Sequence, residues 1–264
     1  MKLEGTHAII TGGSRGIGLA TARALQERGG RVSLVARDGE VLARSLAELG
    51  GEAHGVRAAA ADVADREALA TAFATLTAEA GPCDVLVTAA GISRPGYFQD
   101  LEDGIFRDLM EVNYFGTLHA VRAVVPGMVE RRRGSIVGVS SAAGLLGVFG
   151  FTAYTPTKFA VRGLLEALRA EMVPHGVHVG CCYPPDVATE MLEREAAYKP
   201  AETEAISGTI RPLAPEQVAR AIVRGIERER FTITADVTTA LLGRLAPLGE
   251  EIVRKVLDRI AARA

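Results

Sequence analysis

Short apolar segments alternate with longer amphipathic segments along the whole of this 264-residue chain. The apolar segments have the length of β-strands, and most lack alternating polar residues, which is typical of strands buried on both faces of a sheet. The segments between them repeat apolar residues at helical spacing. No internal repeat or low-complexity linker divides the pattern. The sequence therefore predicts one doubly wound α/β domain, with about seven parallel strands and helices on both faces.

The expected elements can be placed along the chain. Asp65 and Pro215 occupy positions typical of helix starts, because an Asp side chain caps the first backbone N–H groups and Pro needs no donor there. An apolar segment is followed by Arg131, Arg132 and Arg133. Because cations stabilise a helix C-terminus, this position predicts a solvated helix end and not an anion site. We expect strands at residues 7–11, 31–36, 83–88, 135–139 and 177–183, with weaker candidates at 54–60 and 231–234.

The charge balance excludes some classes of protein. Thirty basic residues stand against 32 acidic ones, for a net charge of −2, whereas a protein built to hold nucleic acid usually has a strongly basic face. The three cysteines do not suggest a disulfide framework, and Met1 leads straight into a strand-like segment without a signal peptide. We therefore expect a cytoplasmic protein that binds no nucleic acid. Residues 134–157 carry no charge, but their serines, threonines and glycines favour a buried strand and loop over a membrane span.

A glycine-rich turn, TGGSRGIG, follows the first expected strand and opens the first expected helix. Gly12, Gly16 and Gly18 would let the backbone turn tightly and bring amide groups close to a pyrophosphate. The spacing differs from GxGxxG, and the alternative is a glycine-rich connection needed only for packing. The position between a strand and a helix at the N-terminus favours a dinucleotide site.

Residues after the second and third expected strands indicate which dinucleotide is bound. Arg37, with Arg15 of the glycine turn, could hold a 2′-phosphate by charge-assisted hydrogen bonds. An acid at the strand end would instead bond the adenosine ribose, and Asp38 follows one residue later. Asp38 can equally cap the next helix, so we expect NADPH (NADP+) as the cofactor. Asp62 and Val63 are candidate adenine contacts, with a loop cap as the alternative role of Asp62.

Tyr154 and Lys158 lie four residues apart at the start of an apolar-faced helix, so their side chains share one helix face. A nearby ammonium favours the phenolate, and we expect Lys158 to lower the pKa of Tyr154 from its ordinary value near 10. The pair would then serve as an acid/base device. Ser141 follows the fifth expected strand, where open α/β sheets place ligands, and its hydroxyl could hold a carbonyl oxygen.

Together these segments resemble the short-chain dehydrogenase/reductase family over essentially the whole chain. The resemblance implies a Rossmann-type fold in which Tyr154 donates a proton and Lys158 lowers its pKa and bonds the nicotinamide ribose. Ser141 would orient the substrate carbonyl, and Asn113 would support a water-linked proton relay. The resemblance implies cofactor contacts at Gly12, Ser14, Arg15, Gly16, Ile17, Gly18, Arg37, Asp62, Val63, Ala90, Gly91, Tyr154, Lys158, Pro184, Val187 and Thr189.

Within that family the chain is similar to the 3-ketodihydrosphingosine reductases over residues 6–230, notably at Pro184-Pro185-Asp186 and in segments 147–154 and 158–164. This similarity implies NADPH-dependent reduction of 3-ketodihydrosphingosine to dihydrosphingosine, a step of sphingolipid synthesis. One alternative is a reductase or dehydrogenase of another hydrophobic ketone or alcohol, 3-ketoacyl or steroid-like. A non-catalytic NADP(H)-binding regulator is the alternative from another class, and the complete set of catalytic residues argues against it.

The substrate end is less constrained by the sequence. A long-chain amino ketone needs an apolar channel with a polar reacting end, and core packing is the alternative role of the apolar side chains near the site. Residues 189–212 are polar and long for a connection, which suits a substrate lid within a domain that spans 1–264. The candidate channel residues are Leu145, Leu146, Val148, Phe149, Met191 and Leu192.

Residues 236–264 form an amphipathic extension that is too charged to span a membrane. It would pack against the body or a second subunit, or lie at a membrane surface to take up a lipid. The family resemblance implies a homodimer or homotetramer. We expect no metal site, because His175, His178, Cys181 and Cys182 would lie along a helix end and a strand.

Overall fold

A computed structural model describes residues 1–207, 211–243 and 259 of the chain. Its seven strands form one parallel sheet in the order β3-β2-β1-β4-β5-β6-β7. The predicted fold class is confirmed, and each expected strand is present with small changes at its ends. The strands are β1 (His7–Thr11), β2 (Arg31–Ala36), β3 (Val56–Ala60), β4 (Val85–Thr88), β5 (Gly134–Val139), β6 (Val177–Cys182) and β7 (Thr232–Ile233).

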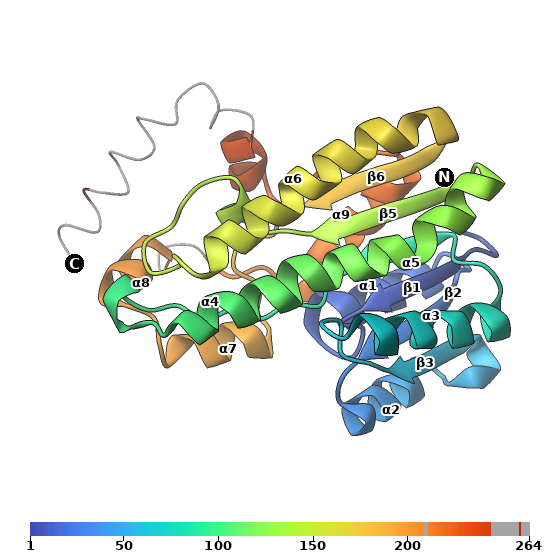
Figure 1. The fold of residues 1–264 in the computed structure, drawn as a ribbon, viewed down its shortest axis with the longest axis horizontal. Helices are drawn as coiled ribbons and strands as arrows, with labels where there is room; N and C mark the ends of the chain where they lie inside the picture. The colour runs from blue at the N-terminus through green and yellow to red at the C-terminus, as the bar shows by residue number, and fades with distance from the viewer. Residues whose placement is uncertain (208–210, 244–258, 260–264) are drawn as a thin grey trace.

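Helices cover both faces of the sheet (Figure 1). One face is covered by α3, α5 and α6, and the other by α1, α2 and α9. The α-helices are α1 (Gly16–Gln26), α2 (Gly39–Glu48), α3 (Arg66–Ala80), α4 (Asp103–Met110), α5 (Gly116–Arg131), α6 (Tyr154–Met172), α7 (Glu190–Ala196), α8 (Ala201–Ser207) and α9 (Pro215–Glu227). Single-turn segments are η1 (Glu52–His54), η2 (Phe98–Asp100), η4 (Ala142–Gly144) and η5 (Val173–His175), and η3 (Glu111–Phe115) is a π-helix.

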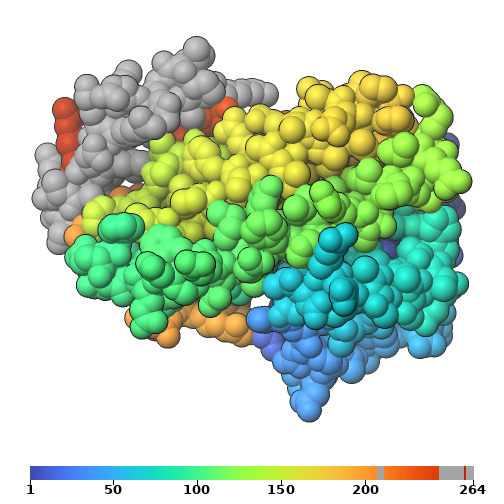
Figure 2. All heavy atoms as spheres, in the orientation of Figure 1, coloured from blue at the N-terminus to red at the C-terminus, as the bar shows by residue number. Residues whose placement is uncertain are grey.

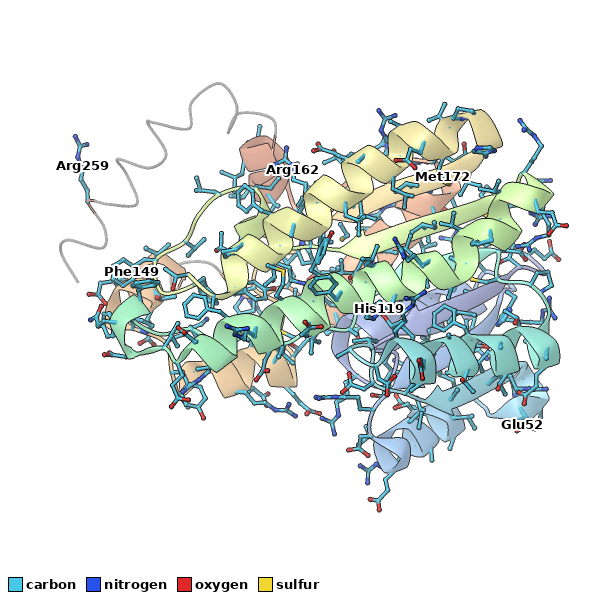
Figure 3. The ribbon with its side chains drawn as sticks, in the orientation of Figure 1. Glu52, His119, Phe149, Arg162, Met172 and Arg259 are labelled. Atoms are coloured by element: carbon cyan, nitrogen blue, oxygen red, sulfur yellow. The ribbon has the colours of Figure 1, made fainter. Side chains whose placement is uncertain are left out.

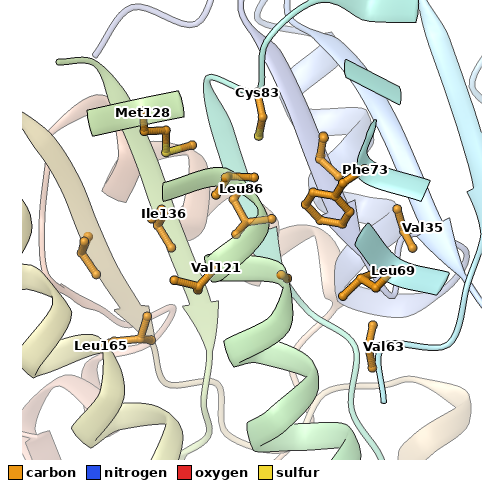
Figure 4. Close-up of a cluster of buried hydrophobic side chains, with 14 of the residues drawn as sticks. Val35, Val63, Leu69, Phe73, Cys83, Leu86, Val121, Met128, Ile136 and Leu165 are labelled. Carbon is orange, nitrogen blue, oxygen red and sulfur yellow. The ribbon is translucent and has the colours of Figure 1, made fainter. Parts of the chain in front are cut away.

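Two apolar cores hold the layers together, one on each side of the sheet. Figure 4 shows part of the first, where Leu69 and Phe73 of α3 pack with Val121 of α5 and Leu165 of α6 against the strands. Figure 2 shows this face of the molecule closed by side chains of α3, α5 and α6. Both cores are made by residues at helical spacing and by the continuous apolar strands, as strands buried on both faces require.

The helix starts predicted from Asp65 and Pro215 are confirmed. Asp65 Oδ1 accepts hydrogen bonds from the backbone N–H groups of residues 67 and 68, and Pro215 is the first residue of α9. Asp38 likewise caps α2, through hydrogen bonds from the backbone N–H groups of residues 40 and 41 at 3.1 Å. Arg131 lies in the last turn of α5 and donates to the backbone oxygen of Cys83 at 2.8 Å.

The ends of the strands meet at one edge of the sheet, the end toward which the arrows of β5 and β6 point in Figure 1. The chain order reverses between β1 and β4, and open α/β sheets bind ligands at such a switch point. α4, α7 and α8 gather at the same end of the molecule (Figure 1). The expected lid, 189–212, contains α7 and α8, and of these two helices only α7 contributes to the lining of the cavity described below.

The charge-free segment 134–157 folds as predicted, into β5, a loop with η4 and the start of α6. Among the described residues, no helix has the length and apolar character needed to cross a membrane. Most of the expected C-terminal extension, at 244–258 and 260–264, lies outside the described residues.

Candidate active site

The glycine turn, residues 12–18, joins β1 to α1 and forms a backbone cradle. Gly12 has φ +66°, and a Cβ atom there would lie 2.7 Å from the backbone nitrogen of Ala90. At Gly18 a Cβ would lie 2.2 Å from the backbone oxygen of Gly12, so only glycine fits. A Cβ on Gly16 would approach Thr189 at 3.0 Å, across the turn. Arg15, the N-cap residue of α1, accepts no side-chain hydrogen bond from the first backbone N–H groups, and a helix start without such a cap can bind an anionic group.

Charged side chains surround the outer end of this cradle. Arg15 pairs with Glu190 at 2.9 Å and with Asp38 at 3.8 Å, and Arg37 pairs with Asp62 at 3.6 Å. Both arginine side chains remain substantially exposed, at 40% and 63%. Asp62 Oδ1 also accepts a hydrogen bond from the backbone N–H of residue 64, the loop-cap role left open above. The arginines are thus near the cradle and held only by exposed ion pairs.

A cavity of about 330 Å³ connects the cradle with the ends of β3 and β4. Val63 is buried at its wall, and Ile17 lies at its glycine-turn end. Met191, expected in a lipid channel, instead lines this cavity. The lining residues are Gly12, Ser14, Arg15, Gly16, Ile17, Gly18, Ala36, Arg37, Asp38, Ala61, Asp62, Val63, Ala89, Ala90, Gly91, Ile92, Ser93, Val112, Thr189, Glu190, Met191 and Arg194.

Tyr154 and Lys158 lie in the first turns of α6, directly beyond the loop that follows β5. Lys158 is 5% exposed, and its Nζ donates to the backbone oxygen of Val139 at 3.1 Å. The same ammonium lies 5.4 Å from the centroid of the Tyr154 ring. Ser140 fixes this part of α6, because its hydroxyl donates to the backbone oxygen of Lys158 at 2.9 Å. The pair is therefore attached to the end of β5 by two hydrogen bonds.

The pKa values of the pair differ from the sequence prediction. Burial raises the pKa of Tyr154, the nearby carboxylates of Glu195 and Asp186 raise it further, and a hydrogen bond from Ser141 lowers it. Burial also lowers the pKa of Lys158 to about 8. The predicted lowering of the Tyr154 pKa is thus wrong for this structure, because burial of the phenol is the largest contribution and raises the pKa. The consequence is a phenol that stays protonated at neutral pH and can donate.

Ser141 lies at the end of β5 and begins η4, where its Oγ accepts a hydrogen bond from the backbone N–H of Ala143 at 3.1 Å. Its hydroxyl is also the hydrogen-bond partner of Tyr154. The structure therefore places two hydroxyl groups side by side, as a carbonyl oxygen would need in order to contact both.

Asn113 is 1% exposed and lies in the π-helix η3 between α4 and α5. Its Oδ1 accepts from the backbone N–H of Ile92 at 2.8 Å, and its Nδ2 donates to the Ile92 oxygen and to Thr157 Oγ1, each at 3.0 Å. A Cβ on Gly91 would lie 3.1 Å from Asn113 Oδ1 and 3.6 Å from Lys158 Nζ. The side chain therefore joins the end of β4 to α6 beside the lysine.

The proline turn after β6 closes the site. The backbone N–H of Ala142 donates to the Pro184 oxygen at 2.8 Å, which ties this turn to the loop that carries Ser141. Val187 is buried and forms a parallel bridge with Leu213, and Thr189 precedes α7 at the mouth of the glycine cradle. Twelve of the sixteen predicted cofactor-contact residues line the cavity, whereas Tyr154, Lys158, Pro184 and Val187 are not part of its lining.

Of the other expected channel residues, Leu145 and Leu146 are buried, and Leu145 belongs to the first core. Phe149 is 40% exposed and contacts Tyr97 edge to face with ring centroids 6.2 Å apart. Figure 3 shows Phe149 at the end of the molecule where α4 and α8 lie, far from Met172 at the other end of α6. Leu145 therefore has the alternative role, core packing. Phe149 instead lies partly exposed at the surface.

Sequence reasoning missed a charged cluster beside Tyr154. Glu195, on α7, is 8% exposed, and Lys199 lies 3.8 Å from its Oε2 and 3.5 Å from Asp186 Oδ2. The i,i+4 spacing of Glu195 and Lys199 was the available signal, but the polar segment around them had no clear periodicity. Within the described residues, no group of three or more His, Cys, Asp or Glu side chains is arranged to hold a metal ion.

Comparison with known proteins identifies the family of the chain. Residues 6–199 match the short chain dehydrogenase family. The chain belongs to this family. Its members are oxidoreductases that use NAD(P)H, and the Rossmann-type architecture and element order agree with that membership.

Relatives within the short-chain dehydrogenase family include sphingoid-base reductases. The chain is 41% identical to 3-dehydrosphinganine reductase of Danio rerio over 237 residues, 88% of this chain and 71% of that protein. It is 36% identical to 3-ketodihydrosphingosine reductase of Dictyostelium discoideum, over 93% of this chain and 79% of that protein. Among solved structures, a single-residue variant of actinorhodin polyketide ketoreductase with NADPH is similar with TM-score 0.80 and 28% identity, covering 90% of this chain and 97% of that one.

The residues of this short-chain dehydrogenase fit a nicotinamide dinucleotide. The glycine cradle admits no Cβ at Gly18, because the start of α1 packs closely against Gly12, as in the glycine-rich turns of dinucleotide-binding folds. The cavity runs from this cradle to Gly91, which lies against Lys158. Gly12, Gly16 and Gly18 would hold the diphosphate, and Lys158 would bond the nicotinamide ribose.

Proposed function

We propose that the chain is an NADPH-dependent 3-ketodihydrosphingosine reductase, which produces dihydrosphingosine. The observation that carries this proposal is the 41% identity to 3-dehydrosphinganine reductase over 88% of the chain. The neighbouring hydroxyl groups of Ser141 and Tyr154 support a reaction at a carbonyl oxygen. The substrate would be a lipid-like amino ketone.

The chain's own residues would manage the oxygen and the proton. The Ser141 hydroxyl would donate a hydrogen bond to the ketone oxygen, and the protonated Tyr154 phenol would transfer its proton to that oxygen. When bound, the nicotinamide supplies the hydride that reduces the ketone carbon. Lys158 would bond the nicotinamide ribose, and Asn113 would support the return of a proton from solvent. The sum is one ketone, one hydride and one proton converted to one alcohol.

Arg15 and Arg37 support NADPH over NADH. Exposed ion pairs such as theirs contribute only about 0.2–1 kcal/mol, so a 2′-phosphate can replace the carboxylates at little cost. Asp38, the acid that would bond a free ribose, uses Oδ1 to cap α2. Arg37→Asp should therefore lower kcat/KM for NADPH relative to NADH by about tenfold or more.

Steady-state rates with the two cofactors test the role of Arg37. Arg122→Asp is a matched control, because Arg122 is exposed on α5 and the charge change is the same. An unchanged preference in the Arg37→Asp chain would mean that Arg15 or another group recognises the phosphate.

A substrate panel tests the proposed reaction. NADPH oxidation would be followed by nicotinamide absorbance with 3-ketosphinganine, a 3-ketoacyl thioester and a steroid ketone as substrates. We expect the highest kcat/KM with 3-ketosphinganine. No oxidation with that substrate, alongside turnover of another ketone, would overturn the proposal in favour of a different hydrophobic substrate.

A further inference from the structure

The charged cluster of Asp186, Glu195 and Lys199 has two carboxylates and one ammonium. Lys199 Nζ lies 3.5 Å from Asp186 Oδ2 and 3.8 Å from Glu195 Oε2, and its side chain is only 11% exposed. Within residues 1–207 and 211–243, Lys199 is the only cation paired with either carboxylate. The Arg94 guanidinium instead lies 3.2 Å over the ring of Tyr198. The cluster therefore carries one negative charge in excess.

This excess charge is costly where it lies. Glu195 is 8% exposed, and an ionised carboxylate taken out of water is stable only when paired. Burial raises the pKa of Glu195, and the charge of Asp186 raises it further, while a hydrogen bond with Ser93 and the charge of Lys199 lower it. A second cation would remove this cost, so the cluster is incomplete with Lys199 alone.

The charges of the cluster act on the phenol that would protonate the substrate. The carboxylates of Glu195 and Asp186 both act on the phenol of Tyr154, with Glu195 the stronger. Asp186 follows the proline turn whose Pro184 oxygen holds the loop of Ser141. The two carboxylates therefore act on the phenol that would protonate the substrate, and Asp186 lies two residues from the turn that is hydrogen-bonded to the Ser141 loop.

We propose that Glu195, assisted by Asp186, binds a protonated amine on the carbon next to the reacting ketone. This inference rests on the proposed function, because the sphingoid ketone carries its amine at that carbon. An amine on the neighbouring carbon must come close to the groups that contact the carbonyl oxygen. Its positive charge would complete the balance of the cluster, with Lys199 holding the two carboxylates in place. With a neutral ketone the two carboxylates would share Lys199 as their only cation, so the cluster selects for amino ketones.

A pair of substrates isolates this charge. 3-Ketosphinganine has a protonated amine, and its N-acetyl derivative has a neutral amide with the same chain and ketone. The ratio of kcat/KM for the two substrates reports on recognition of the amine, while a general loss of folding or cofactor binding lowers both values. We expect the wild-type ratio to favour the amine by about tenfold or more, because the amine can make a charge-assisted hydrogen bond that the neutral amide lacks.

Glu195→Gln should lower that ratio by about tenfold or more, mainly through a higher KM for the amino ketone. Asp186→Asn should lower it less, because Asp186 is more exposed and acts more weakly on Tyr154. Glu193→Gln is the matched control on the same helix, because Glu193 is exposed, and the ratio should not change.

The outcomes distinguish the two proposals. A wild-type chain that reduces 3-ketosphinganine with a ratio unaffected by Glu195→Gln would overturn the amine site alone. An equal fall in kcat/KM for both substrates in the Glu195→Gln chain would assign Glu195 a structural role and also overturn it. A wild-type chain that reduces neither sphingoid substrate, but does reduce a 3-ketoacyl thioester, would overturn the proposed function together with the amine site.

Discussion

Tyr154→Phe is expected to remove turnover and to leave NADPH binding nearly unchanged. The substitution deletes one hydroxyl group that lies beside Ser141 and keeps the ring that packs over the lysine. Loss of a general acid typically lowers the rate by about 10² to 10⁴-fold. Initial rates of NADPH oxidation and a fluorescence titration of NADPH provide the two readings. Normal turnover in this chain would overturn the assignment of Tyr154 as the proton donor.

Lys158→Met is expected to remove turnover and to stabilise the fold at pH 7. Burial lowers the Lys158 pKa from 10.5 to about 8, so the unfolded chain binds more protons between these two values. The contribution of Lys158 to the free energy of unfolding therefore rises as the pH rises from about 8 to 10.5. Below pH 8 the buried Lys158 ammonium destabilises the fold by about 3 kcal/mol at most.

Urea titrations of the wild-type and Lys158→Met chains test whether the buried ammonium destabilises the fold. The free energy of unfolding of the Lys158→Met chain should exceed that of the wild type by about 1–3 kcal/mol at pH 7, with part of the gain offset by the hydrogen bond lost at Val139. The difference should shrink as the pH rises toward 10. A substituted chain that is less stable than the wild type at pH 7 contradicts the prediction.

At the scale of elements, Gly18→Ala is expected to damage both the fold and the cofactor site. The new methyl group would meet the backbone oxygen of Gly12, which cannot move without reshaping the cradle. We expect the free energy of unfolding to fall by about 1–3 kcal/mol, as for other overpacked sites, and NADPH binding to weaken. Gly163→Ala in α6 is the control, because nothing lies within 4 Å of its Cβ and removing a helical glycine stabilises by about 0.5–1 kcal/mol. Equal effects of the two substitutions on NADPH affinity would contradict a cradle at Gly18.

The strands were predictable because the parallel sheet is buried on both faces and leaves uninterrupted apolar segments in the sequence. Their ends were less certain, as at β4, where Cys83 is apolar and buried but β4 begins only at Val85. The π-helix η3 was not predicted, since its residues share the helical pattern of the flanking α4 and α5. The spacing of apolar residues does not reveal a helical turn that contains one additional residue, as in η3.

At the scale of the whole molecule, NADPH should stabilise the chain against heat. A ligand that binds only the folded state at 100 times its Kd adds about 2.7 kcal/mol to the free energy of unfolding. For a domain of this size that corresponds to a rise in Tm of about 5–10 °C. Thermal denaturation with NADPH, with NADH and without either provides the measurement. A larger shift with NADH than with NADPH would contradict the proposed cofactor preference.

The site could be predicted only where its residues belong to local motifs. The glycine turn and the Tyr154–Lys158 pair are readable because each is contained in a few neighbouring residues. Glu195 lies on α7 and Asp186 follows the proline turn, and only the folded chain brings both carboxylates close enough to act on the Tyr154 pKa. The direction of the Tyr154 pKa likewise depends on burial by the assembled molecule, which spacing along one helix does not reveal.

The orientation of α4 relative to α5 depends on the number of residues in the π-helix η3 between them. The backbone N–H of Gly116 donates to the oxygen of Glu111, five residues back, where a regular helix would reach four. Deleting one residue between 111 and 115 would restore regular bonding and rotate α4 by about 100° relative to α5, the angle between successive residues of an α-helix. Asn113 would then lose its register with Ile92 and Thr157. A relative that lacks the additional residue must therefore present a different face of α4 to the same neighbours, even if every other residue of the helix is identical.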